Sequence, residues 1–171
     1  MDARRLHSQQ YALAVHSHVA ERGKTQVTLH LIKLCVGAAS IEDLADWQKA
    51  RAAEQKKAGE TQRVFHTTFQ TPKRVDDLLA GGSLYWVIKG TVQVRQRLVG
   101  FEEGTKADGS RCCLFLLDKT LVPVRPVPRR AFQGWRYLDA SDAPPDLGRG
   151  DKQIAELPPQ MRRELVALGL L

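Results

Sequence analysis

The chain is poor in cysteine and has no long run of apolar residues. Its three cysteines are an odd number, which argues against a disulfide framework and fits a reducing compartment. The longest apolar runs, such as 112–117, fall far short of the roughly 20 residues that a membrane-spanning helix needs. Residues 1–24 lack the apolar stretch of a secretion signal. We therefore expect a cytoplasmic protein that does not enter a membrane.

Motifs of catalysis and of metal binding are also missing. The chain has no G-x-S-x-G nucleophile turn and none of the glycine loops that hold nucleotide phosphates. Cys112 and Cys113 are adjacent in an expected strand, so their side chains point to opposite faces and cannot chelate one metal ion together. His30 and His66 have no partner at ligand spacing. We predict no catalytic residue, no metal and no cofactor.

The length suits one domain, and the charge is unevenly distributed along it. At 171 residues with 43% apolar and 26% charged residues, the chain has the composition of an ordinary globular domain. The net charge is +7, and residues 83–137 hold ten basic and four acidic residues, which accounts for +6 of it. Most of the cations in this segment are arginines, whose planar forks bind phosphate and stack on bases. A basic face that only aids solubility is the alternative.

Periodicity and capping signals predict alternating strands and helices. Ser40 is placed to cap a helix, and Asp108-Gly109 is typical of a hairpin turn. The prolines of 121–127 confine that strand to a sheet edge. Trp47 and Trp86 are expected to face the core. We expect strands over 26–35, 63–69, 83–89, 91–99, 111–118, 121–127 and 132–138, and helices over 40–57, 72–80 and 159–168.

These elements predict one folded domain with flanking segments. Residues 25–138 are expected to form an α+β domain, in which 132–138 closes the sheet. Residues 1–24 are expected to be an arm that is disordered or not native, with the natural start near Val27. Residues 139–151 have the proline, glycine and aspartate composition of a linker. Residues 152–171 are expected to carry a helix that docks on the domain.

Three stretches of the chain resemble known proteins. They are TLHLIKLCVGAASIEDLADWQ, GGSLYWVIKGTVQVRQRLVGFEE and PRRAFQGWRYL. Together, over about residues 28–171, they resemble a family of short uncharacterised bacterial proteins known mainly from alphaproteobacteria, a likeness that implies no particular activity. The order of LLAGG, LYWVIK, RLVGFEE and VPVRPVPRR is similar to the PUA-like small barrels, including the ASCH and EVE types. That likeness implies an α+β fold built on a small mixed or antiparallel, partly closed β-barrel with peripheral helices. Proteins of that group commonly bind RNA or modified bases.

The arginines and aromatic residues of the basic segment suggest the function. Aromatic planes stack on unpaired bases while cations neutralise phosphates, and a surface that combines both binds single strands. We predict non-catalytic binding of RNA or of a modified nucleobase. The candidate nucleic-acid-binding residues are Lys89, Arg95, Arg97, Arg129, Arg130, Trp135, Arg136 and Tyr137.

Two other functions are compatible with the sequence. One is an enzyme that acts on nucleic acid or nucleotides, with Glu102 or Asp118 as acid or base. The other is a protein interaction module that uses the C-terminal helix, with Leu165 and Leu168 as apolar anchors.

Overall fold

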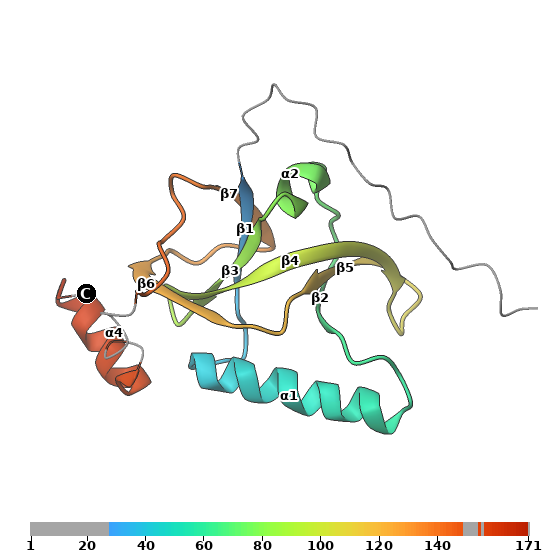
Figure 1. Cartoon of the computed structure of the whole chain (residues 1–171), viewed down its shortest axis with the longest axis horizontal. Helices are drawn as coiled ribbons and strands as arrows, with labels where there is room; N and C mark the ends of the chain where they lie inside the picture. Colours follow the sequence, from blue (N-terminus) through green and yellow to red (C-terminus); the bar gives the residue numbers. More distant parts are fainter. Residues whose placement is uncertain (1–27, 149–153, 155, 171) are drawn as a thin grey trace, which may run out of the picture.

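The computed structural model describes residues 28–148, 154 and 156–170, which form an α+β domain around one curved sheet (Figure 1). The strands are β1 (Leu29–Leu34), β2 (Val64–Thr68), β3 (Ser83–Ile88), β4 (Thr91–Thr105), β5 (Arg111–Leu117), β6 (Val122–Pro128) and β7 (Trp135–Asp139). The helices are α1 (Ile41–Lys57), α2 (Val75–Leu79) and α4 (Pro159–Ala167). The predicted order of elements is confirmed. None of these helices combines the length and the apolar character that crossing a bilayer requires.

The sheet is open rather than closed. Its strands pair in the order β2-β5-β4-β3-β1-β7, and β6 pairs with β4 off this path. β1 and β3 are parallel, and the other strand pairs are antiparallel. β2 and β7 stand at the two ends of the order and form no ladder with each other within the described residues. The strand expected to close the sheet therefore extends it at β1, and the partly closed PUA-like barrel is not confirmed.

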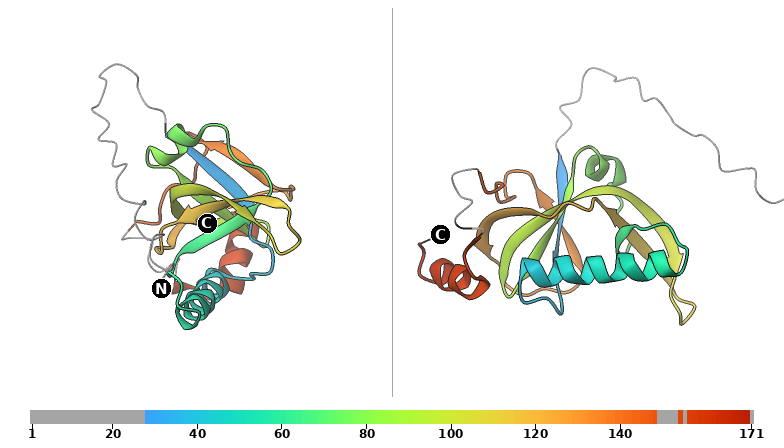
Figure 2. Two further views of the ribbon diagram at one scale, coloured as in Figure 1. Left: turned by 90° about the vertical axis from the view of Figure 1, so that its right-hand side faces the viewer. Right: turned by 60° about the horizontal axis from the view of Figure 1, so that its bottom comes forward.

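The long strand β4 curves the sheet. Its first half pairs with β3 and β6, and its second half pairs with β5. The register shifts between Val92 and Val94 opposite β6, and again between Leu98 and Gly100 opposite β5. Such irregularities bend a strand and increase its twist. The curl of β4 brings β5 and β2 over the face that α1 covers (Figure 2).

Each face of the curved sheet carries its own hydrophobic core. Along β1, Leu29 and Leu31 belong to the larger core, whereas Ile32 belongs to the smaller one, because side chains of a strand alternate between faces. Trp86 is only 3% exposed in the larger core, so its predicted burial is confirmed. The larger core consists of Leu29, Leu31, Leu44, Leu78, Leu84, Trp86, Ile88, Val94, Leu98, Cys113, Phe115 and Leu117. The smaller core consists of Ile32, Tyr85, Val87, Val92, Val124 and Leu138.

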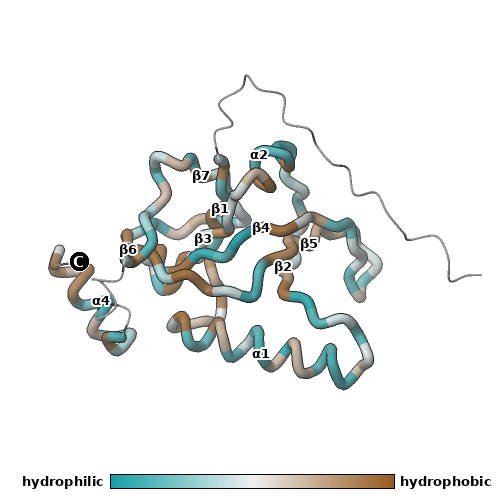
Figure 3. Tube along the Cα trace, viewed as in Figure 1, coloured by the Kyte–Doolittle hydropathy of each residue, from teal (hydrophilic) through white to brown (hydrophobic). Residues whose placement is uncertain are grey.

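Helix α1 begins at its predicted cap and lies across the larger core. The hydroxyl Oγ of Ser40 accepts a hydrogen bond from the Asp43 amide at 3.1 Å, which confirms the cap. Most of α1 is hydrophilic (Figure 3), and among its buried residues are Leu44 and Gln48. The prediction that Trp47 faces the core is wrong, because its side chain is 51% exposed. Neighbouring helical positions point about 100° apart, so burial of Gln48 leaves Trp47 on the flank of the helix.

Helix α2 meets β3 at a junction that only glycine fits. The Gly82 amide donates a hydrogen bond to the carbonyl oxygen of Leu78 at 2.8 Å. A Cβ atom at Gly82 would collide with the carbonyl oxygens of Leu78 and Leu29. This close backbone approach sets the position of α2 over the start of β1.

The described residues of the expected linker, 139–148, are fixed to the domain. The Arg95 guanidinium donates to both carboxylate oxygens of Asp146 at 2.6 Å, and the Leu147 amide donates to the carbonyl of Pro123 at 3.0 Å. Residues 149–151 of that linker and the expected arm 1–24 lie outside the described residues. Helix α4 follows, and Arg163 on it donates to the carbonyl of Ala39 at 3.0 Å.

Candidate functional site

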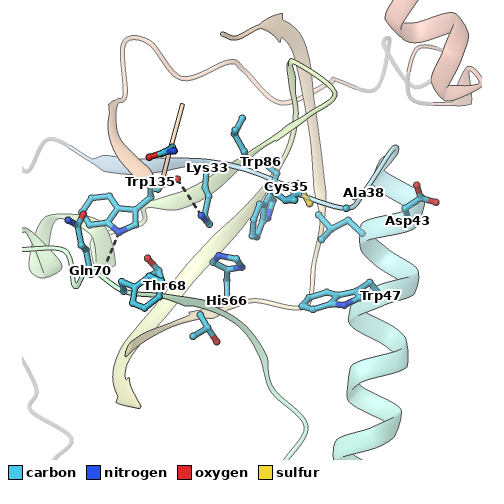
Figure 4. A pocket seen from close by; sticks show the side chains of 18 of the residues that line it. Lys33, Cys35, Ala38, Asp43, Trp47, His66, Thr68, Gln70, Trp86 and Trp135 are labelled. Atoms are coloured by element: carbon cyan, nitrogen blue, oxygen red, sulfur yellow. Dashed lines mark hydrogen bonds between the residues drawn. The ribbon is translucent and has the colours of Figure 1, made fainter. Parts of the chain in front are cut away.

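A cavity of about 750 Å³ lies at the open seam of the sheet. It is bounded by the end of β1, the start of α1, strand β2 with the residues that follow it, and the start of β7 (Figure 4). All three tryptophans of the chain line it, namely Trp47, Trp86 and Trp135. We call this cavity the tryptophan pocket. Its volume lies within the range of about 300–1,000 Å³ that is usual for small-molecule sites.

The floor of the tryptophan pocket is a row of three side chains on adjacent strands. Lys33 on β1 is in register with Trp86 on β3 and with Trp135 on β7. Directly opposed residues in a sheet project from the same face, so the lysine lies between the two indoles, as Figure 4 shows. Its ammonium donates a hydrogen bond to the carbonyl of Gly134 at 3.3 Å. Burial lowers the pKa of Lys33 below its ordinary value.

Hydrogen bonds across the seam hold Trp135 in place. Its indole Nε1 donates to the carbonyl oxygen of Gln70, just after β2, at 3.0 Å. Tyr137, two residues along β7, packs edge-on against Trp135 with ring centroids 5.2 Å apart. The Tyr137 hydroxyl accepts hydrogen bonds from the amides of Lys73 and Arg74 at 2.9 and 3.3 Å. These contacts join the two ends of the sheet, between which the described residues form no strand ladder.

The inner wall of the pocket is Trp86 with His66 against it. Trp86 donates its indole hydrogen to Oε1 of the buried Gln96 at 2.9 Å, which fixes the plane of the ring. The His66 ring meets Trp86 edge-on, with centroids 5.2 Å apart. Burial, with the positive charges of Lys33 and Arg51, lowers the pKa of His66 to about 4, so the imidazole is neutral at physiological pH. Its buried Nε2 has no hydrogen-bond partner among the described residues.

The mouth of the pocket combines exposed rings with cations. Trp47 projects from α1 toward the cavity (Figure 4), and the Arg51 guanidinium lies 5.3 Å from its ring centroid. On the opposite side, the Lys106 ammonium lies 3.1 Å from the ring centroid of the exposed Phe69. Such cation–π contacts orient rings and keep positive charge at the opening.

The pocket does not have the chemistry of a nucleophile or of a metal centre. Burial raises the pKa of the Cys35 thiol in its lining to about 11, so the thiol stays protonated and unreactive at neutral pH. Among the residues that the structure describes, no three histidine, cysteine or carboxylate side chains gather in a way that would hold a metal ion. The indole rings around the cavity are suited to contact with a planar ligand.

The predicted nucleic-acid-binding residues fall into separate groups. Trp135 lines the pocket, and the Tyr137 ring packs edge-on against the Trp135 ring without lining the pocket itself. Lys89, at the tip of the β3–β4 hairpin, and Arg129, after β6, meet at a second hollow of about 250 Å³. The stretch 34–38 lines this hollow and the tryptophan pocket alike, so the two cations stand just beyond one wall of the pocket.

The other predicted cations do not join that pair. Arg95 is engaged by Asp146 and by the Ser83 hydroxyl, so its guanidinium serves the fold. Arg97 and Arg130 are exposed outside both hollows. Arg136 lies 5.7 Å from the ring centroid of Phe132.

Lys33, Trp47 and His66 are pocket residues that the sequence-based prediction missed. A signal for Lys33 exists in the sequence. It follows Leu29 and Leu31 at the spacing of two that marks the inward face of β1, where a lysine breaks the apolar pattern. Positions that break a local rule without a structural need are often functional.

Residues of the two alternative functions lie away from the tryptophan pocket. Glu102 accepts hydrogen bonds from Arg63 on the exposed surface, and Asp118 accepts one from the Thr120 amide in a turn. Leu165 on α4 is half-buried, and Leu168, which caps the end of α4, is 70% exposed.

Comparison with known proteins identifies one relationship. A family model described as "Protein of unknown function (DUF1489)" matches residues 31–171. No curated protein and no solved structure matches the chain.

Proposed function

This chain belongs to the DUF1489 family, and we propose that it binds single-stranded RNA without catalysis and holds one base in the tryptophan pocket. The observation that carries the proposal is the convergence of all three tryptophans on one cavity from β3, β7 and α1. A base is planar, apolar on its faces and polar at its edges. The pocket offers indole surfaces together with the Lys33 ammonium and the neutral His66 imidazole, which match those properties.

The energetics of stacking support a base as the ligand. Stacking of one base on an aromatic side chain is worth about 1–3 kcal/mol. Trp135 is already held by a hydrogen bond to the carbonyl of Gln70, whereas Trp86 is only 3% exposed and presents little surface to a ligand. Because the Trp135 ring loses little freedom when a ligand binds, most of its contact energy is available for binding.

Cations beyond the pocket wall suit the phosphates that flank a bound base. Lys89 and Arg129 converge on the second hollow, which adjoins the pocket through the stretch 34–38. Lys106 stands on the other side of the opening, over Phe69. A strand that inserts one base could place a neighbouring phosphate at either point. Phosphate contacts of this kind provide affinity independent of sequence.

The order of elements also supports this proposal. Helix α2 is followed by a glycine pair, β3, the long β4, a hairpin turn into β5 and the proline-rich β6, and this order resembles that of the PUA-like barrels. We propose that the open sheet is a relative of those barrels and that the seam between β2 and β7 became the binding site. A cytoplasmic location would give access to RNA.

Fluorescence anisotropy with labelled single-stranded RNA tests the proposal. The Trp47→Ala variant should lose roughly 5- to 150-fold in affinity, the equivalent of one stacked base, and should keep its thermal stability because Trp47 is half exposed. The matched control is Leu168→Ala, which removes a different exposed apolar side chain, at the C-cap of α4, and should bind as the wild type does. Undetectable binding of RNA by the wild type at low salt would refute the proposal.

The salt dependence of the same binding measures the phosphate contacts. On single strands the slope of log affinity against log salt is about −0.7 per contact. The double variant Lys89→Ala/Arg129→Ala should therefore flatten the slope by about 1.4 units, from two contacts. Lys56→Ala/Lys57→Ala removes the same charge at the far end of α1 and should leave the slope unchanged. Equal slopes for both double variants would place the phosphates elsewhere.

A further inference from the structure

The Lys33 ammonium is positioned to donate to a ligand in the tryptophan pocket. Its β1 position between Trp86 and Trp135 places the side chain among the indoles. An ammonium has three protons, and the hydrogen bond to the Gly134 carbonyl uses one of them. The ammonium lines the pocket together with His66 (Figure 4), so its other protons are available to a ligand there. A half-buried ammonium gains from an acceptor on the ligand, because burial has reduced its contact with water.

The charges around the pocket oppose a cationic ligand. Several aromatic rings around one cavity are an arrangement that binds quaternary ammonium groups elsewhere. Here the corresponding positions already hold cations, with Lys33 between two indoles and Arg51 beside Trp47. Asp43 is the carboxylate of the lining, and its Oδ2 accepts a hydrogen bond from the Ala39 amide at 2.9 Å. A second positive charge would be repelled, so the ligand ring is neutral or anionic.

From this geometry we infer that the tryptophan pocket selects oxopurines, guanine or hypoxanthine, over adenine, and that Lys33 is the residue that determines the choice. The inference deepens the proposed function and rests on it. Guanine and hypoxanthine present two adjacent acceptors, O6 and N7, which is the edge that lysine and arginine most often contact. Adenine replaces O6 by an amino group, whose hydrogens would face those of the ammonium.

The size and the neutral wall of the pocket agree with a purine. A cavity of about 750 Å³ holds a two-ring base with its ribose. His66, opposite Lys33, is neutral and so adds no repulsion to the purine edge.

Binding of purine mononucleotides to the full chain tests the inference by isothermal titration. Inosine and adenosine 5′-monophosphates have the same size and phosphate and differ at the 6-position. The wild type should bind inosine and guanosine monophosphates at least roughly fivefold more tightly than adenosine monophosphate. 7-Methylguanosine monophosphate, whose ring is cationic and whose N7 is blocked, should bind more weakly than guanosine monophosphate.

The Lys33→Met variant tests whether Lys33 causes the preference for oxopurines over adenine. Methionine keeps an unbranched stem of similar length between the indoles, so the variant should bind inosine and adenosine monophosphates about equally. Lys49→Met, an exposed lysine on α1, is the matched control and should keep the wild-type ratio. Should Lys33→Met fail to fold, two measurements still test the inference. They are the ratio of the wild-type affinities for inosine and adenosine monophosphates, and the same ratio in Lys33→Arg, which should be unchanged.

The outcomes separate the two proposals. Equal wild-type affinities for inosine and adenosine monophosphates, an unchanged ratio in Lys33→Met, or tighter binding of the 7-methyl nucleotide would overturn the oxopurine inference. Failure of all these mononucleotides to bind would overturn it too, while RNA binding in the anisotropy assay would leave the proposed function standing. Absence of binding in both assays would refute both.

Discussion

Replacing the buried Gln96 of β4 by leucine should destabilise the protein more than the same replacement at Gln93, which is also buried on β4. The Gln96 side chain is fully buried at 0% exposure. Its Oε1 accepts from Trp86 Nε1 and from Gln48 Nε2, each at 2.9 Å. Its Nε2 donates to Gln48 Oε1 and to the Asp118 carbonyl, each at 3.0 Å. One amide thus ties β3, α1 and the end of β5 to β4.

The size of the effect follows from the groups that lose their partner. Gln96→Leu keeps the volume of the side chain but leaves the Trp86 indole hydrogen, the Gln48 amide and the Asp118 carbonyl unsatisfied. Each such buried group costs about 1–3 kcal/mol, partly offset by the apolar burial of leucine. We expect a loss of about 4 kcal/mol from the free energy of unfolding, a large share of the typical 5–15 kcal/mol.

Urea unfolding monitored by tryptophan fluorescence measures this loss. The matched control is Gln93→Leu on the same strand, because the buried Gln93 donates one hydrogen bond, to the Ile88 carbonyl at 3.0 Å. That variant should lose only about 1–2 kcal/mol. If Gln96→Leu lowers the free energy of unfolding no more than Gln93→Leu does, the hydrogen bonds of Gln96 do not hold Trp86 and α1 in place.

Two further stability predictions follow from the pocket and from the α2–β3 junction. His66 has a folded-state pKa of about 4, below its ordinary value of 6.5, so the stability that its neutral form contributes is complete above pH 6.5 and is lost as the pH falls toward 4. Between pH 7 and pH 4 the wild type should lose about 3 kcal/mol more in urea unfolding than His66→Gln, and parallel pH profiles would contradict this. Gly82→Ala should cost about 3 kcal/mol or more in thermal or urea unfolding, because its Cβ collides with the Leu78 and Leu29 carbonyls. Gly104→Ala, whose Cβ would meet only side-chain atoms of Cys112 and Leu114 at 3.2 Å or more, should cost clearly less, and equal costs would refute the steric argument.

The local elements were predictable because their signals are short-range. Ser40 caps α1 through the Asp43 amide, an interaction between residues three apart. The Asp108-Gly109 pair lies in the turn between β4 and β5, as its hairpin signal predicted. Trp86 is buried because Leu84 and Ile88 share its face of β3.

The predictions that were wrong or incomplete depend on how helices and strands that are distant in the sequence pack against each other. Trp47 carries a helical apolar spacing, but the adjacent position of α1, Gln48, is the buried one and is hydrogen-bonded to Gln96, 48 residues away. The strand at 135–139 pairs with β1, and β2 has a single strand partner among the described residues, so the sheet is open there. The ion pair of Arg95 could not be predicted from the sequence either, since its partner Asp146 lies 51 positions away.

By itself, the sequence determined the α+β class, the order of strands and helices, and the concentration of positive charge in 83–137, because periodicity, caps and composition are local properties. Only the tertiary structure decided that Lys33 stands between Trp86 and Trp135 and that Trp47 and His66 complete the pocket. The physical reason is that strand register and the curl of β4 arise from contacts between distant segments. Those contacts choose which of many possible neighbours each side chain meets.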